Sequence, residues 1–555
     1  GTTNSLAVYN KLAGAAEPAS YDWTFSAGNT GAAGGIMAFS GADPVLETDS
    51  GVNTASGTSS ATASVTTALA NTMIITSHGI GSSSTWTPPG GMSETVDATG
   101  GSAALEMNYV LQVAAGASGA KTATATVAGT GNAHIIALRR VLGAFNAFET
   151  TTPAGSTSGF IKTKISGTTV NVAITALNAA QTAVATYYVG TMRIEILDAS
   201  DNSGALDPNA CRPTWTLIQT LSPDLTFTAA DNGRKNTSFT VANSYPNARI
   251  RMTSPAGAPN TTACSSDNFA IRPNQFINVT FQDADWQTAG TTRTLNNLTV
   301  PSGTVHKAGR PLTVQATAVN GAGTPATTTN YAGTATTTIA NCGGSSACVA
   351  APSGTLTIGA SFSAGQLNST VANYSDVGAV AVTLVDSTFA AVDASDGSTA
   401  AEMNITTSSP VNVGRFVPDH FAVALNTPSF GTACAAGGFT YVGQPFNYTT
   451  APVITITAQN FTNGTTAKYT GALWQITNAS LTLKSYTAAS GPVDASGITG
   501  TDPVIADSGG GAGTLTFGSG TGVLLTRTTT PVAPFNAEVS LAIFVIDLDL
   551  VAYAT

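Results

Sequence analysis

The chain carries Thr175-Ala176-Leu177-Asn178 followed by Tyr188-Val189-Gly190, and this pattern returns twice. The second copy is Thr317-Ala318-Val319-Asn320 with Tyr331-Ala332-Gly333, and the third is Thr457-Ala458-Gln459-Asn460 with Tyr469-Thr470-Gly471. The copies lie roughly 140 residues apart, which is the length of one domain. Most of the chain is therefore a tandem array of one kind of domain.

The sequence on both sides of the pattern alternates between apolar and polar residues, as in residues 170–174 and 192–197. Such alternation indicates β-strands, so we expect the pattern to join two strands. The Asn suits a turn because its side chain bonds nearby backbone, the Tyr buries a ring, and the Gly permits a tight bend. These roles are structural and imply no chemistry.

Length and composition indicate several extracellular β-domains. The 555 residues predict three or four domains, and only 9% of them are charged, against about 25% in ordinary soluble domains. A Thr-rich and Gly-rich chain with periodic Val, Ile, Leu and Phe favours β-sandwiches over a disordered chain. We expect an all-β fold of tandem sandwiches, with a jelly-roll-like domain over residues 1–142 and Ig-like repeats over 143–273, 274–416 and 417–555.

Short linkers favour a stiff rod over beads on a flexible string. Repeats 2 and 3 open with similar segments, Arg272-Pro273-Asn274-Gln275-Phe276 and Val417-Pro418-Asp419-His420-Phe421. In each, the Pro forces an extended backbone and the Phe is expected to enter the next core. In the N-terminal domain we expect strands near residues 5–9, 21–25, 35–39, 73–77 and 133–138.

Five cysteines are present, and their spacing does not fit a zinc site. Cys342 and Cys348 predict a short disulfide-closed hairpin tip. Cys211 and Cys264 fall in the same repeat, so we pair them, and Cys434 then has no assigned partner. Either bridge implies an oxidising compartment.

Charge and hydropathy exclude two classes of partner. A net charge of -10 without Lys or Arg clusters argues against nucleic acid. The most apolar run, residues 541–546, is far shorter than the roughly 20 residues of a membrane helix. No signal peptide precedes the first domain, so we expect a secreted protein to be present here in a mature or trimmed form.

Candidate reactive groups are scattered. Carboxylates pair at Asp283 with Asp285, Asp393 with Asp396, and Asp547 with Asp549, and we interpret them as acids on exposed faces rather than catalytic pairs. The best candidate calcium loop holds Asp198, Asp201 and Asp207, but it lacks EF-hand spacing. No other cofactor is expected. Sugar stacking remains open for Trp23, Trp86, Trp215, Trp286 and Trp474, although burial in the core is the commoner fate of Trp.

Three longer phrases resemble a known family. They are Ala263-Cys264-Ser265-Ser266-Asp267-Asn268-Phe269-Ala270-Ile271-Arg272-Pro273, Gly414-Arg415-Phe416-Val417-Pro418-Asp419-His420-Phe421 and Phe439-Thr440-Tyr441-Val442-Gly443-Gln444-Pro445-Phe446. They resemble the MshQ-like family of large bacterial surface proteins, linked by name to biogenesis of the mannose-sensitive haemagglutinin pilus. The resemblance covers about residues 140–555, and the preceding residues resemble a β-sandwich module of such proteins. It implies an extracellular, pilus- or adhesion-linked role, supplies no catalytic residue, and leads us to expect that relatives extend further at both ends.

These observations favour a non-enzymatic structural or adhesive protein of a bacterial cell surface that assembles into, or decorates, a filament, pilus or sheath. A carbohydrate-binding adhesin is the alternative, and a polysaccharide-degrading enzyme is a third possibility. The segment 539–551 predicts a last strand on which Asp547 and Asp549 mark a solvent-facing side. An uncovered sheet edge there would let subunits associate end to end. The competing expectation is a truncated sequence whose missing strands would complete both end domains within one chain.

Overall fold

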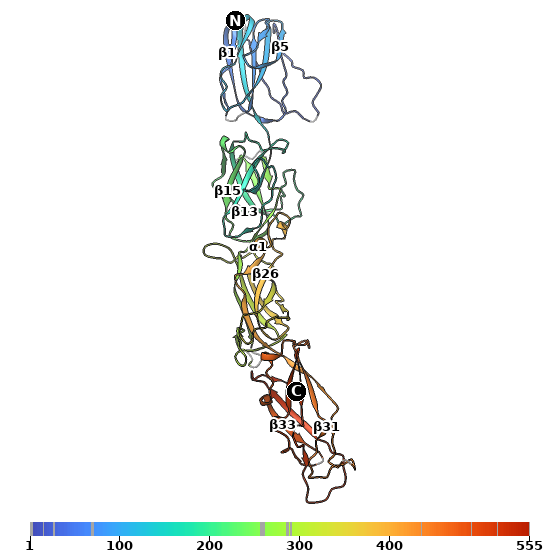
Figure 1. Ribbon diagram of the computed structural model, residues 1–555. Helices are drawn as coiled ribbons and strands as arrows, with labels where there is room; N and C mark the ends of the chain where they lie inside the picture. The colour runs from blue at the N-terminus through green and yellow to red at the C-terminus, as the bar shows by residue number, and fades with distance from the viewer. Residues whose placement is uncertain are drawn as a thin grey trace.

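The computed structural model describes residues 4–14, 16–25, 28–67, 71–255, 261–284, 288, 291–434, 436–489, 491–518 and 520–553. Within them the chain is almost entirely β-strand, with one α-helix, α1 (Ala400–Met403), and four short 3-10 turns. Four bodies follow one another in chain order and give an elongated molecule, in which the last body is tilted away from the line of the first three (Figure 1). We call them the N-terminal domain and repeats 1, 2 and 3.

The N-terminal domain is built on one large antiparallel sheet of order β1-β8-β3-β6-β5. Its strands are β1 (Ala42–Ala61), β2 (Thr66–Thr67), β3 (Thr72–Ile80), β4 (Trp86–Thr87), β5 (Ser93–Gly100), β6 (Ala103–Gln112), β7 (Gly116–Ala117) and β8 (Thr122–Arg140). The central strand β3 is buried along nearly its whole length, because β6 and β8 pair with its two edges.

The strands expected near residues 5–9, 21–25 and 35–39 do not form. The described part of residues 4–41 runs without strand pairing, and large apolar side chains such as Tyr9, Trp23 and Phe25 lie exposed on it. Alternation alone does not make a strand, since a strand also needs a partner edge for its backbone hydrogen bonds.

Repeat 1 packs two sheets of order β15-β11-β9 and β10-β18-β16-β12-β13 around one core. Its elements are β9 (Leu142–Glu149), β10 (Lys164–Ile165), β11 (Val170–Asn178), β12 (Gly190–Asp198), β13 (Thr216–Thr220), β14 (Leu225–Phe227), η1 (Ala229–Asp231), β15 (Arg234–Phe239), β16 (Tyr245–Ser254), β17 (Thr261–Cys264) and β18 (Phe269–Arg272).

Repeat 2 connects its strands in the order β21-β28-β26-β27-β19-β22-β25-β24 around a second core. Its elements are β19 (Gln275–Ala284), β20 (Thr292–Thr294), β21 (His306–Lys307), β22 (Leu312–Val319), β23 (Thr336–Ala340), β24 (Leu356–Thr357), β25 (Gln366–Tyr374), β26 (Gly378–Asp386), η2 (Ala391–Asp393), α1, β27 (Ile405–Thr407) and β28 (Val411–Val417).

Repeat 3 has sheets of order β29-β32-β36-β35 and β33-β38-β39. Its elements are β29 (His420–Leu425), β30 (Ser429–Phe430), β31 (Tyr448–Thr450), β32 (Val453–Gln459), η3 (Gly471–Leu473), η4 (Asn478–Ser480), β33 (Leu481–Thr487), β34 (Val493–Asp494), β35 (Val504–Gly509), β36 (Ala512–Thr516), β37 (Leu524–Leu525), β38 (Ser540–Ile546) and β39 (Ala552–Tyr553). The chain is thus an all-β array of β-sandwiches.

The chain passes from body to body over very few residues. One residue separates β8 from β9, two separate β18 from β19, and two separate β28 from β29. Linkers of this length cannot act as flexible coils, so the contacts beside them decide how the bodies are oriented.

The acids expected on exposed faces are mostly buried, so that interpretation was wrong. Asp283, Asp393, Asp547 and Asp549 are all buried, Asp396 is half-buried, and Asp285 lies outside the described residues. Asp547 accepts hydrogen bonds from the amides of Asp549 and Val551, and burial raises its pKa to about 6. Asp547 and Asp549 therefore do not mark a solvent-facing side at the end of β38.

Candidate functional site

The repeated Asn closes a turn in all three repeats, and we call it the Asn turn, although the amides that it accepts lie at different positions after the Asn. In each, the Asn Oδ1 accepts two backbone amides of the segment that follows. The donors are Thr182 and Ala183 at 2.9 and 3.3 Å for Asn178, Ala322 and Ala326 at 3.3 and 3.0 Å for Asn320, and Thr462 and Gly464 at 3.0 and 2.9 Å for Asn460. The side chain thus replaces the carbonyl groups that would otherwise satisfy these amides.

The repeated Tyr is buried beneath each Asn turn. Tyr188 pairs its hydroxyl with Ser254 at 2.6 Å, and Tyr331 donates to Asp386 at 2.6 Å. The hydroxyl of Tyr469 accepts the amide of Gln475 at 3.2 Å. Burial raises the pKa of all three phenols, so they remain neutral and serve as core anchors.

The three glycines of the pattern differ from one another. Gly190 opens β12 and Gly471 opens η3 with a positive φ of 59°. At Gly333 it is steric crowding that requires glycine, because an added Cβ would lie 2.3 Å from Asp386 Oδ2 and 2.4 Å from the Tyr331 hydroxyl. Among the three glycines, only Gly333 is thus required because it lies so close to the Tyr of its own pattern and to the Asp386 that this Tyr binds.

The Asn turns of repeats 2 and 3 also hold neighbouring bodies together. Asn320 Nδ2 donates to the Ala242 carbonyl at 3.1 Å, and Asn460 Nδ2 donates to the Ser375 carbonyl at 2.9 Å. In each case the residue after the Asn donates its amide across the same junction. Gly321 donates to Ser166 at 2.7 Å, and Phe461 donates to Ala308 at 2.9 Å.

Each junction closes over a glycine of the preceding repeat. Gly167 and Gly309 have φ values of 76° and 80°. An added Cβ would lie 2.8 Å from Asn320 Cγ at Gly167, and 2.9 Å from the Phe461 amide nitrogen at Gly309. Glycine is therefore needed twice over, for its backbone angle and for the close approach of the Asn turn.

Repeat 3 contains a glycine with the same local geometry. Gly443 has a φ of 86° and donates its amide to Leu525 at 2.7 Å, just as Gly309 donates to Tyr374 at 2.7 Å. The nearest atom that an added Cβ at Gly443 would meet is Arg527 Cβ at 3.6 Å. Among the described residues, no Asn turn lies against Gly443.

The junction after the N-terminal domain is built differently. The Tyr187 hydroxyl donates to the Val141 carbonyl at 3.0 Å, and the Arg140 guanidinium lies 5.1 Å from the Tyr187 ring centre. Asn178 Nδ2 reaches only Thr182 Oγ1 of its own turn, at 3.5 Å. Its Asn turn therefore caps a loop without bridging two bodies.

Buried ionisable groups reinforce the two repeat junctions. Asp393 of repeat 2 accepts the Thr163 hydroxyl at 2.5 Å and the Ala270 amide at 3.1 Å, both from repeat 1. Burial raises the Asp393 pKa to about 7. Between repeats 2 and 3, Arg415 forms a two-pronged ion pair with Asp549, one arm of it at 2.6 Å. These contacts fix orientation as well as distance.

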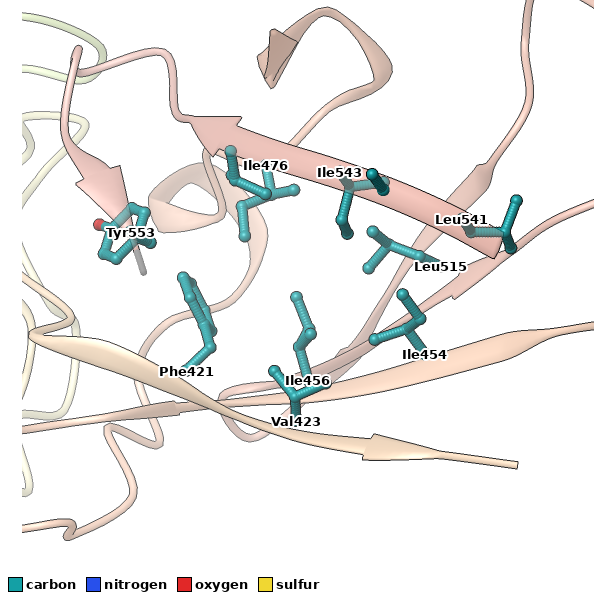
Figure 2. Close-up of a pocket in the computed structure, with 11 residues that line it drawn as sticks. Phe421, Val423, Ile454, Ile456, Ile476, Leu515, Leu541, Ile543 and Tyr553 are labelled. Carbon is teal, nitrogen blue, oxygen red and sulfur yellow. The ribbon is translucent and has the colours of Figure 1, made fainter. Parts of the chain in front are cut away.

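An apolar cleft opens in repeat 3 between β29 and β32 on one side and β38 on the other (Figure 2). Its volume is about 300 Å³. Phe421, Val423 and Ile456 project from below, and Leu541 and Ile543 project from above, so that their side chains point toward one another. A lining without charged groups suits apolar side chains rather than a polar substrate.

The cleft lies where the other two repeats place a strand. In repeat 2, β27 pairs with the last two residues of β26, and β28 then pairs with β26 from Gly378 to Val382. In repeat 1, β17 and β18 divide β16 in the same way. In repeat 3, β39 pairs with Val545 and Ile546 of β38, and no strand of the described residues corresponds to β28.

The sequence-based candidates occupy separate places. Cys211–Cys264 and Cys342–Cys348 both lie at bonding distance, with S–S separations of 2.07 and 1.99 Å, and Cys434 is free. The carboxylates of Asp198, Asp201 and Asp207 each accept amides of their own turns. Within the described residues, no group of three potential metal ligands comes together.

The tryptophans divide between the cores and the surface. Trp86 and Trp215 are buried, Trp474 packs against the Tyr469 ring, and Trp286 lies outside the described residues. Trp23 is 53% exposed. Trp23 is therefore the tryptophan of the described chain that is best placed to meet a partner.

Comparison with known proteins gives one family match. Residues 376–555 match the family model described as DUF6701, third domain. This DUF6701 region covers the end of repeat 2 and all of repeat 3, so it contains the Asp549 ion pair and the cleft. No curated protein matches the chain. The MshQ-like resemblance remains a resemblance of short phrases.

The solved structures that match this chain do so with low TM-scores. Dimeric latent PorU from Porphyromonas gingivalis matches with 13% identity and a TM-score of 0.15, over 57% of this chain and 26% of that chain. Escherichia coli alpha-2-macroglobulin matches with 12% identity and a TM-score of 0.16, over 90% of this chain and 31% of that chain. A variant of Salmonella alpha-2-macroglobulin matches with 10% identity and a TM-score of 0.12, over 90% of this chain and 40% of that chain. The chain thus spans less than half of each of these proteins, and the TM-scores are too low to show a shared fold.

No helix of the described residues is long and apolar enough to cross a membrane.

Proposed function

We propose that this protein is a non-enzymatic, extracellular rod of a bacterial cell surface, which assembles into or decorates a filament, pilus or sheath. The observation that carries this proposal is the repeated junction. Two successive junctions are built from equivalent groups. Each uses the side chain of the pattern Asn, the amide of the residue after it and a positive-φ glycine of the preceding repeat. A protein whose repeated junctions fix the spacing of its domains is suited to a structural role, in which its two ends are held at a constant distance.

Three further features support a surface location. Two disulfides are typical of proteins that fold outside the reducing cytosol. The low content of charged residues and the Thr-rich strands are typical of extracellular sandwich arrays. The phrases that resemble the MshQ-like family, whose name implies an extracellular role, fall in the repeats.

The proposal predicts one extended shape in solution. Small-angle scattering of the purified chain should give the profile of a single stiff rod, and electron microscopy of cells should place antibody label on surface fibres or their tips. A broad ensemble of bent shapes, or label confined to the cytoplasm, would contradict the proposal. Hydrolase or lyase turnover of a polysaccharide by the purified chain would contradict its non-enzymatic part.

A carbohydrate-binding adhesin is the second candidate, favoured by the exposed Trp23 and the Tyr21 ring 6.4 Å from it. Neighbouring exposed aromatic faces can stack on sugar rings. A glycan array with the wild-type chain and a Trp23→Ala variant tests this function. Binding that disappears in the variant would favour the adhesin.

A further inference from the structure

The two disulfides occupy different places in their repeats. Cys211 and Cys264 are buried and belong to an apolar cluster of repeat 1. Cys342 and Cys348 are half-buried, and neither belongs to the core of repeat 2. They close an irregular loop, residues 342–348, which we call the disulfide loop. The second bridge therefore holds a surface loop in shape rather than a core.

The two ends of the disulfide loop are attached to repeat 2 unequally. At its end, the Ala379 amide donates to the Ala347 carbonyl at 2.8 Å, and the Val349 amide donates to the Ala379 carbonyl at 3.2 Å. At its start, just after β23, Asn412 Nδ2 lies 3.5 Å from the Cys342 carbonyl, which is a long contact. The bridge thus ties the looser start of the loop to its anchored end.

The disulfide loop holds the neighbouring residues 297–304, which we call the clamp loop. Ser346 Oγ accepts the Val300 amide at 3.0 Å, and the Ala347 amide donates to the Leu298 carbonyl at 3.2 Å. Both contacts come from residues that lie between the two cysteines. The bridge therefore fixes the positions from which the clamp loop is held.

The clamp loop in turn contacts repeat 3. The Ser302 amide donates to Asp549 at 2.9 Å, and the Ser302 carbonyl accepts Arg415 Nη2 at 3.3 Å. Because Arg415 is also paired with Asp549, these three residues form one closed set of contacts across the junction between repeats 2 and 3. This junction is the place where the line of the molecule changes direction (Figure 1).

We propose that the Cys342–Cys348 bridge controls the stiffness of the junction between repeats 2 and 3, and that a dithiol which opens the bridge loosens this junction. With the bridge open, the disulfide loop no longer holds the clamp loop, and Ser302 moves away from Asp549. Repeat 3 then changes its orientation more freely. This inference rests on the proposed function, because it adds a means of control to the stiffness of the rod.

The opening step is thiol–disulfide exchange. One thiolate of the dithiol attacks a bridge sulfur and forms a mixed disulfide, and the second thiol of the reagent then closes on the first. The dithiol leaves as a disulfide, and its two electrons and two protons end on the thiols of Cys342 and Cys348. Since the rate depends on access to the sulfur atoms, this half-buried bridge opens before the buried Cys211–Cys264 bridge.

Hydrogen exchange of the full chain tests the coupling, in a Cys434→Ser background that contains no free thiol. In Cys342→Ser/Cys348→Ser, the amides of Val300 and Ser302 should lose protection by about tenfold or more, because their partners are no longer held in place. The amides of β26 in repeat 2 should keep the protection that they have in the parent chain.

Two further variants are matched to this one. Cys211→Ser/Cys264→Ser removes the other bridge and should leave the exchange of the Ser302 amide unchanged. Ser346→Ala keeps both bridges and removes the acceptor of the Val300 amide, so the protection of Val300 should fall. If Ser346→Ala left the Val300 amide fully protected, the disulfide loop would not be what holds the clamp loop, and the inference would be wrong.

Small-angle scattering measures the effect on the shape of the wild-type chain. A low concentration of dithiothreitol should reduce Cys342–Cys348 first, and alkylation with peptide mapping identifies the thiols that have formed. The reduced chain should show a wider range of orientations of repeat 3, and reoxidation should restore the starting profile. This measurement needs no substitution, so it tests the inference even if the double variant folds poorly.

The outcomes separate this inference from the proposed function. An unchanged Ser302 amide and an unchanged scattering profile after the bridge opens would overturn the inference and leave the stiff rod standing. Loss of protection throughout β26 would also overturn it, because the bridge would then support the core of repeat 2. A broad ensemble of bent shapes in the fully oxidised chain would instead contradict the proposed rod.

Discussion

The dual role of Asn460 gives the sharpest test of how the rod is held together. Asn460→Ala removes three hydrogen bonds within the Asn turn, from the Thr462 amide, the Thr462 hydroxyl and the Gly464 amide, and one across the junction, to the Ser375 carbonyl. Each such bond contributes about 0.5–1.5 kcal/mol net, and Asn460 is buried, so nothing replaces the lost partners. We expect Asn460→Ala to destabilise the turn and junction by about 2–4 kcal/mol.

A second substitution separates the two roles. Asn460→Asp keeps an acceptor for the turn amides but loses the Nδ2 donor and sets a carboxylate against the Ser375 carbonyl. It should leave the turn formed and weaken the junction. The matched control is Asn178, whose Oδ1 also caps a turn but whose Nδ2 bonds no other body. Asn178→Ala should cost about 1–2 kcal/mol, and Asn178→Asp close to nothing.

Hydrogen exchange reports on the turn, and small-angle scattering reports on the junction, so the two roles of Asn460 are measured independently. Protection of the Thr462 and Gly464 amides should fall by about 30-fold or more in Asn460→Ala and stay close to wild type in Asn460→Asp. Small-angle scattering should show greater bending for both Asn460 variants and none for the Asn178 variants. If Asn178→Ala bent the rod as much as Asn460→Ala, the junction bond would not be what holds the bodies in line.

Three more predictions concern the buried bridges. Reducing Cys211–Cys264, 53 residues apart, should destabilise repeat 1 by about 4 kcal/mol, and an unchanged melting temperature of the Cys→Ser pair would contradict this. The folded pKa of Asp393, about 7, lies above its ordinary value of 3.8. Its stabilising contribution is therefore full below about pH 4 and is lost as the pH rises to about 7, and denaturation of Asp393→Asn across this range should lack that slope. Arg415→Ala should cost about 3–5 kcal/mol because Asp549 is left buried without its partner, and Arg415→Met/Asp549→Leu should recover most of that loss.

The sequence contains enough to identify the array but not its junctions. The Asn turn could be predicted because the side chains of Asn and Tyr carry the signal in a local pattern. The partners of Asn320 and Asn460 across the junctions are backbone carbonyls of Ala242 and Ser375, 78 and 85 residues away. A carbonyl has no side-chain signature. Gly167 and Gly309, which lie shortly before the long strands β11 and β22, were the signal that could have revealed the junctions.

Burial was the property that sequence reasoning judged least well. Asp547 and Asp549 looked like solvent-facing acids because they alternate with apolar residues after an apolar strand. The structure buries both, since Arg415, 134 residues earlier, supplies the charge that Asp549 needs. Residues 21–25 gave the opposite error. Their alternation fits a strand, but the chain offers no edge beside them, and the aromatic residues stay exposed.

The Asn turns couple the stiffness of the rod to the folding of each repeat. One Asn side chain both closes the turn of its own repeat and bonds the preceding one, so the junction bond depends on the turn of the downstream repeat. Stability in such an array is a sum of repeat and neighbour contributions. A repeat that opens locally therefore loses its upstream contact as well, and the rod hinges at that point. Because the bond runs from one side chain to one carbonyl, a single substitution at Asn320 or Asn460 should loosen one chosen junction while both neighbouring cores remain folded, and the buried Asp393 and Arg415–Asp549 contacts should still hold the bodies together.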